Sequence, residues 1–443
     1  MHAAPDSFAS PLDDLLAQAM REHGEGRLDA ARSLYAQILA AAPRHGDALH
    51  LSGVLEAQGG RYEEAAALIG RAIEADPRAA MFRNNLGNVH LECGRFDEAE
   101  ACYIQAIELD PDRLDALNNL GVLFGRRGRP KEAVMLLERV IERMPDFADA
   151  RINLANQHLR EGRLAEAADQ CVRGMVVAPR SPGLRRLLGV AYSMLGRNDQ
   201  AIAVYRAWLD EEPGHPVAEF HLAACGASAP PERAPDAYVR QVFDSFATSF
   251  DAKLAALDYR APQLVAGALE RHGPAPAHAL EVLDAGCGTG LCGPLLAPWA
   301  RRLVGVDLSP GMLGKARARA VYDDLFVGEL VAFLESRPAA FDLVVAADTL
   351  VYFGPLERFA AAAAACLRPG GLVIFTLEAE PDASTSTYRL HEHGRYSHRR
   401  PYVESALAGA GFEMLELTPA VPRSEALVPV RGWLVAARRG ESR

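Results

Sequence analysis

Three glycines and two aspartates in the second half of the chain have types and spacings suited to binding a nucleoside. An apolar run stops at Asp284, and Gly286, Gly288 and Gly290 follow it. Glycine lets the backbone turn sharply and lets a ligand lie against it, which a β-carbon would prevent. A second apolar run ends at Asp307, where a carboxylate can accept hydrogen bonds from two ribose hydroxyls. The pattern predicts a nucleoside cofactor.

The spacing of the glycines separates this motif from the dinucleotide fingerprint. That fingerprint runs G-x-G-x-x-G, but counted from Gly286 its last position is Leu291. The pattern here is D-x-G-x-G-x-G. It resembles the first motif of class I S-adenosylmethionine-dependent methyltransferases, with Asp307 at the place of that family's acidic residue after strand two. The resemblance implies S-adenosyl-L-methionine as the cofactor. A nicotinamide enzyme is the alternative, and the glycine spacing conflicts with it.

The same resemblance implies roles for residues after the later strands. Glu329 matches the family's contact with the adenine amino group, and Asp348 opens a segment that should border the transferred methyl group. Asp284 can orient the loop or the cofactor's amino group. Two alternatives remain open: Asp307 as a helix cap, and Glu329 as a first-turn helix charge. The expected cofactor-binding residues are Asp284, Gly286, Gly288, Gly290, Asp307, Glu329 and Asp348.

A histidine-rich segment after the fifth expected strand supplies catalytic candidates. Residues 388–400 contain three of the thirteen histidines and two tyrosines. In the family that the motif resembles, the loop at this place commonly lines the acceptor pocket. His391, Tyr396 and His398 are therefore the candidate catalytic residues, and a base is needed only where the acceptor must lose a proton. The alternative is a solvated polar loop. A metal site is disfavoured because no acidic ligands accompany the His-x-His spacing.

Composition and absent motifs narrow the function further. The 443 residues are 49% hydrophobic and 24% charged, which indicates a globular protein of at least two domains. The net charge of −11 disfavours nucleic acid as a partner. Neither an Asn/Asp-Pro-Pro-aromatic motif nor a Pro-Cys nucleophile follows the fourth expected strand. Their absence disfavours amino methylation of nucleic-acid bases and methylation of cytosine C5. The expected acceptor is an O, N or C atom on a small molecule or a protein.

The cysteines and the N-terminal sequence give an expectation for the cellular location of the protein. Seven scattered cysteines without a CxxC pair indicate neither a disulfide framework nor a zinc site. No secretory signal and no run long enough to span a membrane is visible in the sequence. We expect a cytoplasmic protein without a membrane partner.

A sheet of parallel strands is needed to position these residues. From Leu280 onward, strand patterns and helix patterns alternate along the chain, as such a sheet requires. Besides the strands that end at Asp284 and Asp307, strands are expected at residues 325–327, 341–347, 372–377, 412–417 and 433–437. Crossover helices are expected at residues 293–301, 312–321, 330–335, 356–367 and 402–409. Seven strands closed by an antiparallel hairpin match the architecture of class I methyltransferases. We therefore predict a Rossmann-like α/β domain over residues 279–443.

The first half of the chain repeats with a period of 34 residues. Gly-Arg recurs six times, starting at Gly26, Gly60, Gly94, Gly128, Gly162 and Gly196. An alanine follows five residues after each glycine, and a proline follows seventeen residues after it. The pattern resembles tetratricopeptide (TPR) repeats, each a pair of antiparallel helices. We predict an all-α solenoid of six repeats plus a capping helix over residues 10–227.

Asparagines recur at one position of the repeat, at Asn85, Asn119 and Asn153. Each carboxamide offers a donor and an acceptor, so a row on the concave face can grip an extended peptide. Peptide-binding superhelices of the TPR family use this device, and the resemblance implies a protein partner or substrate. The alternative is that these asparagines bridge neighbouring repeats or face water.

Residues 228–236 contain three prolines and no periodicity, so we expect a linker there. Residues 237–278 are expected as a helical leader. In the methyltransferases that the motif resembles, such helices often lie across the cofactor. The candidate lid residues are Tyr238, Phe243, Phe246 and Tyr259, and the alternative is plain packing against the sheet.

Together these features predict an S-adenosylmethionine-dependent methyltransferase fused to a TPR array that recruits a protein. The chain resembles bacterial predicted methyltransferases that carry such repeats. The alternative is a catalytically silent interaction scaffold whose methyltransferase fold senses the cofactor.

Overall fold

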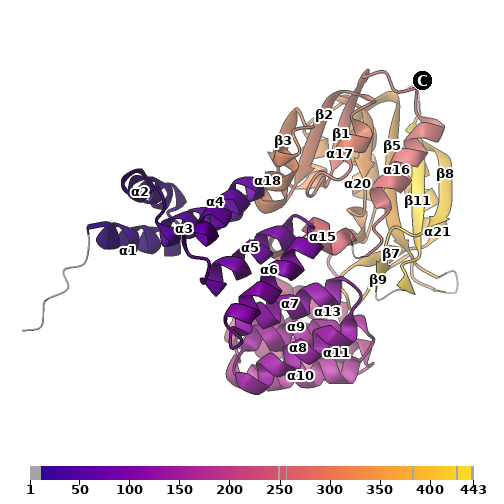
Figure 1. The fold of residues 1–443 in the computed structure, drawn as a ribbon. Helices are drawn as coiled ribbons and strands as arrows, with labels where there is room; N and C mark the ends of the chain where they lie inside the picture. The colour runs from indigo at the N-terminus through magenta and orange to yellow at the C-terminus, as the bar shows by residue number, and fades with distance from the viewer. Residues whose placement is uncertain (1–10, 248–249, 256, 382–383, 426–427, 441–443) are drawn as a thin grey trace, which may run out of the picture. The chain divides into compact units, whose positions relative to one another are not determined.

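The structure is a computed structural model, and it describes residues 11–247, 250–255, 257–381, 384–425 and 428–440. The chain divides into two compact units, Met1–Pro145 and Asp146–Arg443. Helices α1 to α8 belong to the first unit, and the elements that follow belong to the second (Figure 1). Within the described residues, no helix combines the length and apolarity that crossing a membrane requires.

The first unit is built from pairs of helices. The glycine after each first helix has a φ between 71° and 78°, a left-handed conformation that glycine adopts without strain and that ends a helix. The expected helix pairs are therefore confirmed. The helices are α1 (Pro11–Gly24), α2 (Leu28–Ala41), α3 (Gly46–Gln58), α4 (Tyr62–Ala75), α5 (Ala80–Glu92), α6 (Phe96–Leu109), α7 (Leu114–Arg126) and α8 (Pro130–Arg143).

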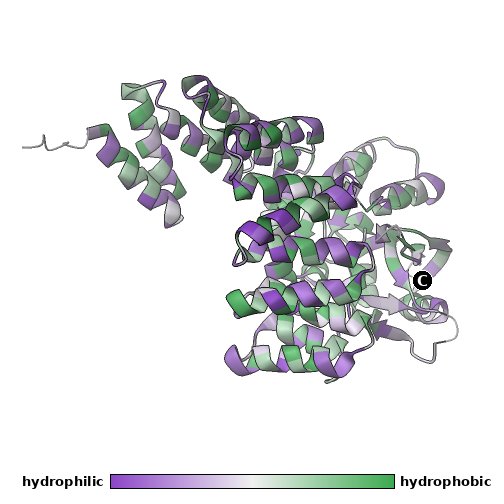
Figure 2. Cartoon of the chain, turned by 60° about the horizontal axis from the view of Figure 1, so that its bottom comes forward, coloured by the Kyte–Doolittle hydropathy of each residue, from purple (hydrophilic) through white to green (hydrophobic). Residues whose placement is uncertain are grey.

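Small residues let the two helices of a pair approach closely. A β-carbon at Gly87 of α5 would lie 2.6 Å from the ring of Tyr103 on α6, so a larger residue would force the ring to move. Hydrophilic and hydrophobic residues share each helix (purple and green in Figure 2), as amphipathic helices require. The alanines that recur near the start of each second helix are fully buried in this unit: Ala31, Ala65, Ala99 and Ala133.

Two further repeats and a capping helix begin the second unit. They are α9 (Ala148–Arg160), α10 (Leu164–Val177), α11 (Pro182–Met194), α12 (Asn198–Glu211) and α13 (Pro216–Ala224). The capping helix is covered by more of the chain: Phe220 packs on Tyr238 with ring centroids 4.4 Å apart, and Leu390 and Tyr396 join the same apolar cluster. The sixth repeat is thus fused to the rest of its unit through a buried core.

The segment expected as a linker is bonded to the later part of the unit. The Ala234 N–H donates to the Tyr352 carbonyl at 2.8 Å, and the Gly354 N–H donates to the Glu232 carbonyl at 2.8 Å. The leader that follows consists of α14 (Asp236–Phe246), α15 (Phe250–Ala255) and α16 (Ala261–His272).

The remainder of the unit is organised by a nine-stranded sheet with the main order β3-β2-β1-β4-β5-β11-β8. Strands β1 to β5 pair in parallel, whereas β11 runs antiparallel to both β5 and β8. The expected seven strands with an antiparallel closing pair are confirmed. They are β1 (Leu280–Ala285), β2 (Ala300–Asp307), β3 (Asp324–Val327), β4 (Phe341–Ala346), β5 (Leu367–Ala379), β8 (Phe412–Ala420) and β11 (Gly432–Arg439).

Two local expectations are wrong. A helix over residues 293–301 was expected, but α17 (Gly293–Leu296) is short, and β2 already begins at Ala300. Residues 388–400 were expected as a loop, but they include β6 (Tyr388–Leu390) and β7 (Tyr396–His398), and β7 pairs in parallel with β5.

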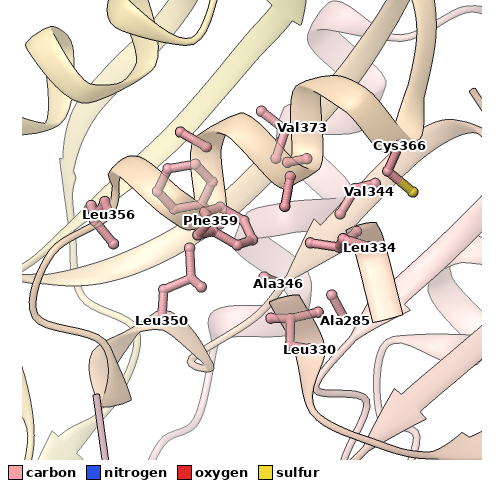
Figure 3. Close-up of a cluster of buried hydrophobic side chains, with 14 of the residues drawn as sticks. Ala285, Leu330, Leu334, Val344, Ala346, Leu350, Leu356, Phe359, Cys366 and Val373 are labelled. Atoms are coloured by element: carbon pink, nitrogen blue, oxygen red, sulfur yellow. The ribbon is translucent and has the colours of Figure 1, made fainter. Parts of the chain in front are cut away.

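Helices cover both faces of the sheet, as buried parallel strands require. The remaining helices are α18 (Pro310–Ala318), α19 (Leu330–Glu335), α20 (Glu357–Cys366) and α21 (Arg400–Gly409). On one face, Leu334 of α19 and Phe359 of α20 pack with Val344 of β4 (Figure 3). On the other face, α16 and α17 pack over Val282 and Val345. Successive side chains of a strand point to opposite faces of the sheet. Packing both faces against helices therefore fixes the strand register and with it the position of the strand ends.

Candidate active site

The carboxyl ends of β1, β2 and β4 border a cavity of about 370 Å³ that lies wholly within the second unit. A volume of this order suits a small ligand or cofactor. The walls come from the loop after β1, from the ends of β2 and β4, from α14 and α15, and from Arg186 of α11. This is where open α/β sheets bind ligands.

The loop after β1 has the conformation that its glycines allow. Gly286, Gly288 and Gly290 have φ values of 73°, 54° and 83°, in the left-handed region that glycine adopts without strain. A β-carbon at Gly286 would collide with Thr349, and one at Gly290 would lie 2.9 Å from the Tyr322 ring. A β-carbon at Gly288 would find only Phe250, at 3.9 Å. The middle glycine therefore leaves open space beside the backbone.

Asp284 is the penultimate residue of β1 and lines the cavity. Its side chain is 1% exposed and accepts a hydrogen bond of 2.6 Å from the Tyr322 hydroxyl. Burial raises the pKa of Asp284 to about 7, because a carboxylate loses hydration there. A cationic group placed beside Asp284 would offset that loss.

Asp307 ends β2 and is bound from two sides. Its Oδ2 accepts from the Gly288 N–H at 2.9 Å, and its Oδ1 accepts from the Ser309 N–H at 2.8 Å. Burial raises its pKa. The N-cap of α18 is Ser309, whose hydroxyl accepts from the Met312 N–H at 3.1 Å. The Asp307 carboxylate is thus held by backbone groups beside the glycine loop, with lone pairs left for a ligand.

Glu329 borders the cavity and also caps a helix. The capped helix is α19, because the two carboxylate oxygens accept from the Val331 N–H at 3.0 Å and the Ala332 N–H at 2.8 Å.

Asp348 belongs to a network of buried charges. It has a φ of 56° and accepts from Arg423 at 2.5 Å. Arg423 also pairs with Glu378, and Arg395 donates to Glu378 at 2.6 Å and to Glu425 at 2.5 Å. Burial alone would raise the pKa of Glu378, but the two arginines outweigh burial and lower it to about 2. This network joins the end of β4 to the segments after β6 and β8.

The three candidate catalytic residues lie outside the described cavity lining. Tyr396 is fully buried, and its hydroxyl donates to the Pro231 carbonyl at 2.5 Å. His398 is fully buried with its Nε2 2.8 Å from the Gly354 carbonyl, and His391 lies 2.7 Å from the Ser397 hydroxyl. From this segment, the cavity is lined by His393 and Arg395. His393 and Arg395 lie in the connection between the paired strands β6 and β7, and this hairpin was not expected from the sequence.

The leader helices line the cavity, and two of their carboxylates bond the loops around it. Tyr238, Phe243 and Tyr259 are lining residues, whereas the side chain of Phe246 lies outside the described residues. Asp244 accepts from the Ser309 hydroxyl and, at 3.2 Å, from the Gly311 N–H, and Asp251 accepts from the hydroxyl of Thr289 and from Arg319.

The asparagine row is engaged within the array. The Asn119 amide donates to the carboxamides of Asn84 and Asn88, at 3.1 and 3.0 Å, in the preceding repeat. The Asn85 amide lies 2.8 Å from His50 Nε2 in the repeat before it. Asn153 also interacts with another group of the protein. In the first unit the asparagines therefore bridge neighbouring repeats.

The sheet order and the left-handed glycine loop define the fold of a class I methyltransferase. A family described as "Methyltransferase domain" matches residues 282–371, and families described as "Tetratricopeptide repeat" match residues 22–82, 77–146, 126–189 and 172–216. The chain thus carries TPR repeats followed by a methyltransferase domain.

This chain spans only about half the length of the curated relatives that it matches. Methyltransferase-like protein 27 of Homo sapiens is 38% identical over 30% of this chain and 55% of its own length. A ubiquinone biosynthesis O-methyltransferase of Methylocella silvestris is 33% identical over 24% of this chain and 42% of its own. A solved S-adenosylmethionine-dependent methyltransferase from Mesorhizobium loti is 24% identical over 39% of this chain and 96% of its own, with a TM-score of 0.33.

Proposed function

We propose that this protein transfers a methyl group from S-adenosyl-L-methionine to an O, N or C acceptor on a small molecule or a protein. The observation that carries the proposal is the loop of three left-handed glycines beside the backbone-bound carboxylate of Asp307. The TPR repeats would recruit a protein partner or substrate, in keeping with the extended surfaces that such arrays present.

The residues around the cavity suit each part of this cofactor. Asp307 retains lone pairs for ribose hydroxyls, and Glu329 lines the cavity beyond the end of β3. The space beside Gly288 would take the methionyl part, and Asp284 would pair with its amino group, gaining a cation that stabilises its ionised form. When bound, the cofactor supplies an electrophilic methyl group on a sulfonium.

The remaining lining would hold the acceptor and exclude water. Val239, Val242, Phe243 and Tyr352 present an apolar surface, and orienting an acceptor there can lower the barrier substantially. Burial raises the pKa of Tyr352 and of Tyr259, so both phenols stay protonated near neutral pH and act as hydrogen-bond donors, not as bases.

Calorimetric titration with S-adenosylhomocysteine tests the cofactor. We expect micromolar binding, no response to NAD, and a loss of roughly ten- to a hundredfold in affinity for Asp307→Asn, because hydrogen bonds to a charged group are removed. Asp199→Asn, an exposed aspartate of α12, should bind as the wild type does.

Two results would count against the enzyme. No binding of S-adenosylhomocysteine by the wild type would contradict the cofactor assignment. Binding without transfer of a labelled methyl group to any member of a broad O-, N- and C-acceptor panel would favour the silent scaffold.

A further inference from the structure

The sixth repeat contributes a charged side chain to the cavity of the methyltransferase domain. Arg186 lies on α11, the first helix of that repeat, and is half-buried. It lines the cavity together with Tyr238 of the leader. Burial raises the pKa of Tyr238, and the charge of Arg186 opposes that increase, so the guanidinium is close enough to act on groups in the wall.

The other cationic lining residues already have carboxylate partners. Arg423 pairs with Asp348 and Glu378, and Arg395 pairs with Glu378 and Glu425. A third arginine, Arg233, pairs with Asp236. Each of these charges is balanced within the protein.

Arg186 differs from these three arginines. Among the residues that the structure describes, no carboxylate pairs with it. Its sequence neighbour Arg185 shows what a structural arginine does on this helix, since Arg185 is buried and pairs with Glu211 at 2.6 Å. His393 also has a carboxylate beside it, because its Nε2 lies 3.8 Å from Glu378.

We propose that Arg186 binds an oxyanion, a carboxylate or a phosphate, on the methyl acceptor. This inference rests on the proposed function and specifies its substrate class: a small molecule with an apolar body, matching Val239, Val242 and Phe243, and an anionic group at the end that faces the repeat. An arginine fork recognises either anion through paired hydrogen bonds. The repeat array would then complete the acceptor site as well as recruit a partner.

The test uses the full chain saturated with S-adenosylhomocysteine and three probes of similar shape: benzoate, phenyl phosphate and the uncharged benzamide. We expect at least one anionic probe to bind more tightly than benzamide, and the tighter anion identifies the acceptor's group. Arg186→Gln should weaken that probe roughly tenfold or more, and Arg186→Lys should weaken it less. Arg173→Gln, an exposed arginine of α10 paired with Asp169, should leave it unchanged, as should each variant for benzamide.

Three outcomes would overturn the inference. Anionic probes that bind no better than benzamide would show that the cavity does not select a charge. Equal probe affinity in Arg186→Gln and in the wild type would show that another group binds the anion. A matching loss of S-adenosylhomocysteine affinity in Arg186→Gln would assign the guanidinium to the cofactor's own carboxylate. If the wild type binds no S-adenosylhomocysteine, the proposed function itself fails, before any probe is added.

Discussion

The asparagines of the first unit differ from Asp284 and Arg186 of the cavity in the partners that they have within the protein. In the repeats, buried asparagines bond to one another across neighbouring helix pairs, as Asn119 does with Asn84. At the cavity, Asp284 is buried with a single hydroxyl donor, and Arg186 pairs with no carboxylate among the described residues. Among the described residues, Asp284 has no cationic partner and the half-buried Arg186 has no carboxylate partner, so the cavity is the place where a charged ligand is expected.

Glycine shows the same contrast. In the array, Gly87 is required because the Tyr103 ring occupies the space of a side chain. In the loop after β1, a β-carbon at Gly288 would meet only Phe250 at the edge of van der Waals contact. One glycine makes room for packing, and the other leaves room for a ligand.

The largest effect on stability is expected from replacing Arg423, which balances carboxylates at the cavity. Arg423 is 3% exposed and pairs with Asp348 and Glu378. Arg423→Met would leave buried carboxylates uncompensated and should lower the free energy of unfolding by about 3–5 kcal/mol. Urea unfolding followed by circular dichroism measures this loss. Arg358→Met, which breaks an exposed pair with Glu335, should change stability by about 1 kcal/mol or less. Equal effects of the two substitutions would contradict a network role.

An intermediate effect is expected in the array. Gly87→Ala should destabilise the protein by about 1–3 kcal/mol, because the new methyl overlaps the Tyr103 ring. Gly70→Ala is the matched control: Gly70 lies within α4 with open space around it, so alanine there should stabilise by about 0.5–1 kcal/mol. Opposite signs in urea unfolding are the expected result. Two shifts of the same sign would mean that the close approach of α5 and α6 does not limit packing.

How much of this could be predicted from sequence depends on the range of each interaction. The left-handed glycines and Asp307 were predictable because turn chemistry and strand ends are written into adjacent residues. The repeat was predictable because its pattern recurs. The partnership of Arg423 with Asp348 was not, since 75 residues separate them and nothing local marks either as a partner. The burial of His398 was hidden for a related reason, because its environment is set by the Gly354 carbonyl from another element.

The smallest expected effect is a dependence on pH, which comes from Asp284 in the cavity. Burial raises the pKa of Asp284 from an ordinary carboxyl value to about 7. The stabilising contribution of its protonated form is therefore complete below the unfolded pKa and is lost as pH rises through about 7. In the ligand-free protein, Asp284 thus weakens the fold as it ionises.

Cofactor affinity should change in the opposite direction. If Asp284 pairs with a cationic amino group, binding requires its ionised form, so S-adenosylhomocysteine should bind about tenfold more tightly at pH 8 than at pH 6 and release a proton on binding at pH 6. Calorimetry in two buffers of different ionisation enthalpy measures both quantities. Asp284→Asn should bind more weakly with a flat pH profile. A wild-type affinity that does not change over this range would mean that Asp284 shapes the loop through Tyr322 and does not meet the cofactor's charge.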